Sequence, residues 1–133
     1  MKIVLTGEES VRLEPTSGQL TIEAPTPEIQ YSPFHMLGSS LGACTLSVLV
    51  SWASHKDLGV DDLKVDVSWD FVEAQHRVGS MKVRLLWPSL AAELWPRAIR
   101  AANLCGIHNT LTHPPVITVE AVGVESPPIE ASA

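Results

Sequence analysis

The stretch SPFHMLGSSLGACTLSVLVSWASH, residues 32–55, decides the fold. Ser32 followed by Pro33 is a typical helix start, because serine caps free backbone N–H groups and proline has no N–H to lose at the first helical position. No proline interrupts 34–55, and apolar side chains occupy nearly every face of that segment. A helix that is apolar all round is normally buried on all sides. We therefore predict a long, buried central helix over 34–55.

Small residues gather on one side of this predicted helix, at Gly38, Ser39, Gly42 and Ala43. Each glycine inside a helix costs roughly 1 kcal/mol relative to alanine, which favours a packing reason for the two glycines over chance. Such a face lets a second helix approach closely, and it predicts a homodimer. The alternative, small residues that merely fit their surroundings, stays open.

Strand patterns surround the helix. Alternating apolar and polar residues, bounded by turn residues, predict short strands before it and a hairpin with one dry and one wet face after it. The chain then gives a second, amphipathic helix and a last strand. The predicted strands are 1–5, 10–14, 20–24, 63–70, 78–87 and 116–124. Together these predicted strands and helices indicate one α+β domain over 1–125, with a tail over 126–133 that we expect to be frayed.

The second helix is predicted over 90–104, with a kink or a late start near Pro96, because proline is poorly tolerated inside a helix. Cys105 and the glycine after it should close that helix. A short turn should follow over 109–113.

Composition excludes several classes of partner. The 133 residues suffice for one domain, and 45% of them are hydrophobic, which is ordinary for a globular chain. A net charge of −6, with lysines and arginines scattered singly, argues against nucleic acid and against an anionic membrane. The longest apolar stretch, 41–53, is too short to span a bilayer, and no targeting segment is visible. We expect a cytoplasmic protein, in which two cysteines mean redox chemistry, metal binding or burial.

The chain resembles a known family in the two segments that hold its only cysteines. SPFHMLGSSLGACT, residues 32–45, is similar to the first signature of the OsmC/Ohr family of thiol peroxidases (osmotically induced protein C and organic hydroperoxide resistance proteins). AANLCGIHNTL, residues 101–111, is similar to that family's second-cysteine segment. The order of elements also matches, up to about residue 124.

The resemblance implies a fold and a reaction. The fold is an intertwined homodimer with antiparallel sheets wrapped round long buried central helices. The reaction is antioxidant: a peroxidatic cysteine, Cys44, attacks an organic hydroperoxide, and a resolving cysteine, Cys105, forms a disulfide with it. The implied partners are a small hydrophobic hydroperoxide and an external dithiol reductant. No cofactor and no metal are implied.

One position departs from the family pattern. The family has a glutamate ten residues before the first cysteine, paired with an arginine of an N-terminal strand, and Phe34 stands at the glutamate position here. Burial raises a cysteine's pKa, and Cys44 lies too far along its own helix to gain from the helix N-terminus, so another cation or donor is required. The supporting candidates are Arg12, Glu28, His35 and His108.

Each of these candidates also has a purely structural interpretation. A free cysteine often fills space in a core. His35 is a capping or packing residue as readily as a site residue, and His108 has a catalytic or a structural role. The four tryptophans are core or interface residues, although one or two of them could line an apolar pocket. The alternative function is a non-peroxidatic member of the family, a small-molecule binding or redox-sensing dimer that kept the scaffold.

Overall fold

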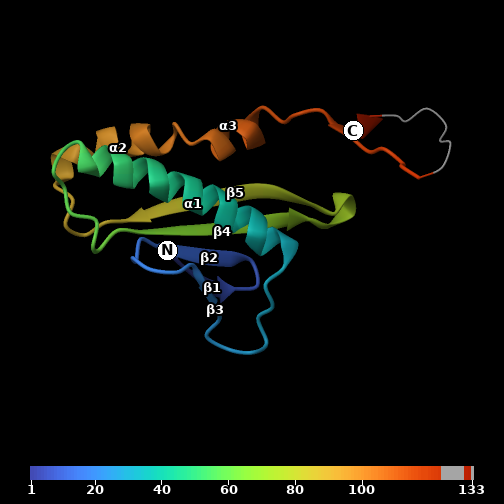
Figure 1. Cartoon of the computed structure of the whole chain (residues 1–133), viewed down its shortest axis with the longest axis horizontal. Coiled ribbons are helices and arrows are strands. Elements are labelled where there is room, and N and C mark those ends of the chain that lie inside the picture. The colour runs from blue at the N-terminus through green and yellow to red at the C-terminus, as the bar shows by residue number, and fades with distance from the viewer. Residues whose placement is uncertain (124–130, 133) are drawn as a thin grey trace.

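The computed structural model describes residues 1–123 and 131–132, and it has one main sheet with a long helix across it (Figure 1). The start of the long helix and the positions of the first five strands lie close to the predicted ones. The elements are β1 (Lys2–Gly7), β2 (Ser10–Glu14), β3 (Thr21–Glu23), α1 (Pro33–Ser54), β4 (Lys64–Val72), the 3-10 turn η1 (Glu73–Gln75), β5 (Arg77–Leu86), the 3-10 turn η2 (Ala92–Leu94), α2 (Trp95–Ala102), α3 (Gly106–Thr112), β6 (Ile117–Thr118) and β7 (Ala131–Ser132). This mixed α+β arrangement is the predicted fold class.

The sheet has five strands in the order β3-β1-β2-β4-β5. β1 and β2 form the expected hairpin, and β4 and β5 form the second one; both hairpins are antiparallel. β3, predicted as a short strand over 20–24, pairs in parallel with β1. The reason is that β2 already pairs with β4 on its other side, so β1 offers the free edge.

α1 begins where the sequence predicts. The Ser32 side chain accepts a hydrogen bond from the His35 backbone N–H, and the His35 ring accepts one from the Ser32 N–H, which makes a reciprocal cap. The helix packs on β2 and β4, and the core lies between these layers. Val11, Val67 and Leu49 are fully buried there. Figure 1 shows α1 in teal, running diagonally between the strands and the later helices.

The prediction that the two glycines of α1 receive a second helix is wrong. A Cβ on Gly38 would lie 2.5 Å from Cζ3 of Trp69, and one on Gly42 would lie 2.2 Å from Cδ2 of Leu13. Both neighbours belong to the sheet, at β4 and β2. The glycines therefore let the helix approach its own sheet.

α1 is also not buried on all sides. Its outward side carries Met36, which is 50% exposed, and four exposed serines. These serines, which we call the outer serine face, are Ser40, Ser47, Ser51 and Ser54.

The length of α1 exceeds the apolar stretch read from the sequence. Among the described residues, α1 is the one helix whose 22 residues and mean hydropathy of 1.4 would suffice to cross a membrane. Length and composition alone are weak evidence, since the core helix of a globular domain has the same properties. In α1, 44% of the 18-residue apolar segment that is long enough for this is buried inside the domain.

The second helical region is divided into two helices. α2 begins at Trp95 with proline in its first turn, so the late start expected near Pro96 is confirmed. Cys105 does not close that helix. Its backbone is extended, with φ −63° and ψ 127°, and it is the N-cap of α3. The short turn predicted over 109–113 is therefore wrong, because α3 occupies most of it.

The last strand is shorter than predicted. β6 has two residues and pairs with β7, Ala131–Ser132. The rest of the predicted tail, 126–130 and 133, and the end of the predicted strand at 124 lie outside the described residues. Figure 1 shows the segment after α3 leading away from the main sheet. Val116 and Val122 there are 83% and 92% exposed.

Candidate functional site

The structure brings the two cysteines together. Cys44 lies half-buried in the middle of α1, and Cys105 is fully buried at the N-cap of α3. α1 and α3 are in contact along this stretch. Both thiols are free, and the two sulfurs are not at disulfide distance. The pair is therefore a site of two neighbouring thiols.

The environment of Cys44 favours its ionised form. Burial by itself raises the pKa of the Cys44 thiol, but three hydrogen bonds act against burial and leave the pKa below its ordinary value. They come from the Cys105 thiol and from the backbone N–H groups of Ile107 and Gly106. The first turn of α3 thus supplies the donors that Cys44 needs.

The environment of Cys105 favours its protonated form. Burial raises the pKa of Cys105, and so does its hydrogen bond to Cys44, since that bond requires the proton to stay on Cys105. The His108 N–H, 3.4 Å from the Cys105 sulfur, and the Ile107 N–H lower this pKa less. One sulfur is therefore poised as a thiolate and its neighbour as a hydrogen donor.

Gly106 and Ile107 were not among the predicted site residues. They act through backbone N–H groups, which every residue except proline carries, so their side chains give no signal in the sequence. The usable signal was Cys105 directly before a glycine. Cysteine is not a preferred N-cap residue, so the sequence does not predict that a helix begins directly after Cys105.

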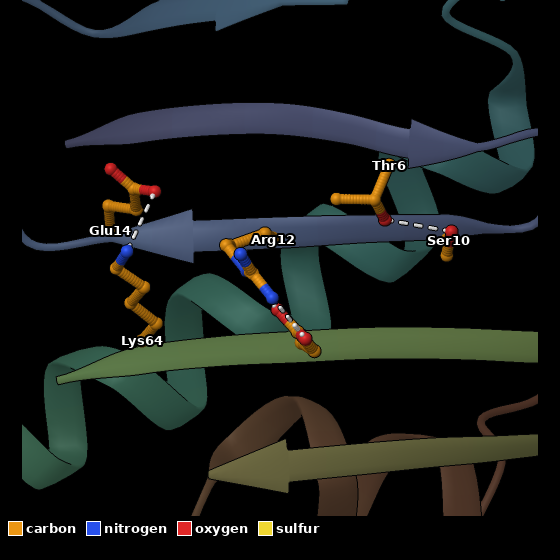
Figure 2. Close-up of polar contacts among 6 residues, drawn as sticks. Thr6, Ser10, Arg12, Glu14 and Lys64 are labelled. Carbon is orange, nitrogen blue, oxygen red and sulfur yellow. Dashed lines mark hydrogen bonds and ion pairs between the residues drawn. The ribbon is translucent and has the colours of Figure 1, made fainter. Parts of the chain in front are cut away.

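Arg12 does not reach the cysteines. Its guanidinium makes two hydrogen bonds to the Asp66 carboxylate, Nε to Oδ1 at 2.6 Å and Nη2 to Oδ2 at 2.8 Å (Figure 2). Its neighbours Val11 and Leu13 are buried, so the alternation of β2 puts Arg12 on the sheet face away from α1. Arg12 is a cross-strand ion-pair residue in this chain.

Glu28 and His35 also lie away from the two sulfurs. Glu28 is exposed in the segment before α1, where a hydrogen bond from the Thr26 side chain lowers its pKa. His35 is 2% exposed, caps α1 and donates from Nε2 to the Gly7 carbonyl at 2.8 Å. These contacts give His35 a capping and packing position. Of the four supporting candidates, the structure places His108 alone beside the cysteines, through its backbone N–H.

A groove of about 950 Å³ runs beside the cysteines. Its walls are β5, one side of α1, and the two later helices. Phe34, at the position of the family glutamate, lines the groove and makes an edge contact with Phe71 at 4.6 Å between ring centres. Trp95 and His108 also line it. The two cysteines do not line the groove themselves; Cys44 follows Leu37 and Leu41, which do, on the same side of α1.

Among the described residues, no three or more histidine, cysteine or acidic side chains gather into a group that could hold a metal ion.

Comparison with known protein families gives a match over most of the chain. The model of the family described as OsmC-like protein matches residues 25–120, which covers both cysteine segments. No curated protein and no solved structure matches the chain. The family includes peroxiredoxin-like members that reduce hydroperoxides.

Proposed function

Since this chain belongs to the OsmC-like protein family, we propose that it is a thiol-dependent peroxidase that reduces organic hydroperoxides through Cys44 and Cys105. The observation that carries this proposal is the lowered pKa of Cys44 beside a protonated Cys105. A thiolate is the nucleophilic form of cysteine, and a low-pKa, partly exposed thiol next to a second thiol is typical of a redox pair.

The first step takes place at Cys44. Its thiolate attacks the distal oxygen of the hydroperoxide, the O–O bond breaks, and Cys44 becomes a sulfenic acid while an alkoxide leaves. The alkoxide takes up a proton and departs as the alcohol. The sulfur is oxidised and the peroxide is reduced by the same two electrons.

The second step uses Cys105. Its thiol condenses with the sulfenic acid of Cys44, which releases water and forms a disulfide. An external dithiol then reduces the disulfide, becomes oxidised itself, and restores both thiols. A disulfide has an S–S distance of about 2.05 Å, so the two sulfurs must approach each other in this step. Cys105 lies at the boundary between two helices, where a change in backbone angles at one residue moves its sulfur.

The proposal includes the partners and the setting of the protein. The partners are a hydrophobic hydroperoxide, an external dithiol and a second copy of the chain, without nucleic acid or membrane, in the cytoplasm. The outer serine face supports the dimer, because small side chains let two helices pack closely. The apolar groove supports a hydrophobic substrate.

Thiol counting after a peroxide challenge tests the reaction. The reduced protein, given an excess of cumene hydroperoxide, should lose both thiols together. Cys44→Ser should keep the Cys105 thiol, and Cys105→Ser should stop at a sulfenic acid on Cys44 that dimedone traps. Two thiols that survive the excess peroxide would refute the proposal.

The second candidate is a non-peroxidatic binding or redox-sensing dimer. The observation that favours it is Phe34 at the position of the family's carboxylate, together with an arginine, Arg12, that is bound elsewhere. This candidate predicts no continuous consumption of cumene hydroperoxide by the protein when dithiothreitol is also in excess. Continuous consumption of peroxide, lost in Cys44→Ser, decides for the peroxidase.

A further inference from the structure

We propose that the His108 imidazole donates the proton to the alkoxide that leaves when Cys44 reduces an alkyl hydroperoxide. The proposal rests on the proposed peroxidase function and adds a catalytic residue to its first step. Three features support it: the face of α3 on which His108 lies, its place directly after the N–H groups that bind Cys44, and the chemistry of the other groove-lining residues.

The His108 side chain belongs to the groove-facing side of α3. The residues of α3 that line the groove are His108, Leu111 and Thr112, and side chains three and four positions apart share one helix face. The preceding residue, Ile107, packs against the core instead. The backbone of His108 is already occupied, because its N–H donates to the Cys105 sulfur at 3.4 Å and its carbonyl accepts from the Thr112 hydroxyl at 3.0 Å. The polar group that His108 offers to the groove is therefore its ring.

His108 also lies next to the reactive sulfur. Cys44 accepts hydrogen bonds from the N–H groups of Gly106 and Ile107, the two residues directly before His108 in the first turn of α3. On the side of α1, Cys44 directly precedes Thr45, which lines the groove. A hydroperoxide that reaches Cys44 from the groove therefore lies between α1 and the face of α3 that carries His108.

The half-buried His108 ring is available to such a substrate. Three other histidines use a ring nitrogen in a hydrogen bond to a backbone carbonyl, namely His35, His55 and His113. The His108 ring makes no hydrogen bond to any residue that the structure describes. Histidine is the side chain that most readily holds and releases a proton near neutral pH, so a free histidine ring in a groove is suited to proton transfer.

The other described residues of the groove lining are poorly placed or poorly suited as acids. None of them is an aspartate or a glutamate, and Arg77 holds its proton too firmly to give it up. Thr45, the groove-lining residue next to Cys44, is only 3% exposed and donates its hydroxyl proton to the Leu41 carbonyl. His76 belongs to the turn between β4 and β5 and not to the helices that hold the cysteines. His108 is thus the acid that the two cysteine-bearing helix segments bring to the groove.

The leaving group makes a proton donor useful. The Cys44 thiolate takes the distal oxygen with its hydrogen, the O–O bond breaks, and its electron pair stays on the alkoxide, which is a strong base. The His108 imidazolium gives this oxygen a proton, so an alcohol leaves and a neutral imidazole remains. The imidazole takes up a proton again when the external dithiol has restored the Cys44 thiol and that thiol ionises. One turnover then consumes hydroperoxide and dithiol and yields alcohol, water and the oxidised dithiol.

Two peroxides with different leaving groups test this role. Cumene hydroperoxide releases an alkoxide, which needs a proton, whereas perbenzoic acid releases benzoate, a weak base that leaves without one. The test variant is His108→Gln, whose side chain is polar but cannot act as an acid. The control is His113→Gln, which changes an exposed histidine at the end of the same helix, outside the groove lining. The readout is the rate of Cys44 thiol loss in a single turnover without added dithiol.

His108→Gln should react with cumene hydroperoxide about a hundred-fold more slowly than the wild type, the usual effect of losing a general acid, and with perbenzoic acid at an unchanged rate. His113→Gln should match the wild type with both peroxides. Alkylation of Cys44 by iodoacetamide should be unchanged in His108→Gln, because iodide leaves without a proton. Equal slowing of both peroxides and of alkylation would show that His108 only maintains the shape of α3, and it would overturn the assignment.

The same comparison separates the proton donor from the peroxidase itself. If the wild type and His108→Gln lose the Cys44 thiol equally fast with cumene hydroperoxide, His108 is not the donor and the peroxidase function stands. If the thiols of the wild type survive both peroxides, the peroxidase function is refuted, and the role of His108 with it.

Discussion

The Cys44 sulfur is activated by donors that are mostly part of the backbone. Two N–H groups of α3 and one neighbouring thiol act on it, and no side-chain cation does so within the described part of the chain. Backbone donors cannot swing away as a long arginine side chain can. This arrangement explains how a chain with Phe34 at the carboxylate position keeps a lowered pKa at its first cysteine.

Loss of the Cys105 thiol should raise the pKa of Cys44. In Cys105→Ala the donor is gone, so the rate of Cys44 alkylation by iodoacetamide at neutral pH should fall by roughly three- to ten-fold, the effect of one ordinary hydrogen bond, because a thiol is a weak donor. The pH at which alkylation reaches half its plateau should move upward, because less thiolate forms at a given pH.

Cys105→Ser is the matched variant, because its hydroxyl can donate in the same place and should keep most of the effect. Arg12→Gln should leave the alkylation profile unchanged, since Arg12 binds Asp66 on the other face of the sheet. An unchanged profile in Cys105→Ala, or a shifted one in Arg12→Gln, would contradict this account of the site.

The sequence identified the two cysteines but not the groups around them. The resemblance rested on residues next to Cys44 and Cys105, which are local in sequence. The position of Arg12 depends on the register of β2 against β4, in which it lies opposite Asp66. No local pattern shows that register, so the arginine could not be excluded from the site before the strands were paired.

At the level of elements, the close contact between α1 and the sheet depends on glycines, which have no side chain. Gly42 lets the helix lie against Leu13 and Val67, and both of these are fully buried. Alanine would improve helix propensity by roughly 1 kcal/mol, but its methyl group would enter space that a core side chain occupies.

We therefore expect Gly42→Ala to lower the free energy of unfolding by about 1–3 kcal/mol, the usual cost of overpacking a core. Urea denaturation followed by tryptophan fluorescence measures it. Ser47→Ala, an alanine substitution on the outer serine face of the same helix, should be neutral or slightly stabilising. A Gly42→Ala protein as stable as the wild type would show that the helix and sheet adjust without cost.

The start of α1 could be predicted and the start of α3 could not. Ser32 and Pro33 are strong signals, and the helix begins at Pro33. α3 begins behind a cysteine, has only seven residues, and buries none of them. A short helix without a buried face leaves no periodic pattern to recognise.

For the whole molecule, the sequence predicted the order and type of the long elements, because each of them has a strong pattern of its own. The parallel pairing of β3 and the exposed outer serine face depend on which edges and faces remain uncovered after the chain has folded. Those are properties of the assembled sheet and helix, so the sequence alone misplaced the packing surface of α1.

The proposed homodimer gives a prediction at this scale. Light scattering of the full chain should give twice the chain mass of 14.4 kDa. Ser47→Arg places a long, charged side chain on the outer serine face, where two copies would have to bury it, and should shift the mass to that of a single chain. Gln19→Arg, in an exposed turn, is the control and should stay dimeric. A single-chain mass for the wild type at every concentration would contradict the dimer.

The Cys105 sulfur has a second role, which follows from its position as the N-cap of α3. It accepts a hydrogen bond from the His108 backbone N–H and so stabilises the first turn of α3. The N–H groups of that same turn donate hydrogen bonds to Cys44. A covalent bond formed at this sulfur must weaken the hydrogen bond that the sulfur accepts from the His108 N–H. The redox state of the Cys105 sulfur therefore affects both α3 and the Cys44 thiolate that α3 stabilises. When Cys105 gives up its proton to form a disulfide, the first turn of α3 is held less firmly, and its N–H groups stabilise the neighbouring sulfur less well.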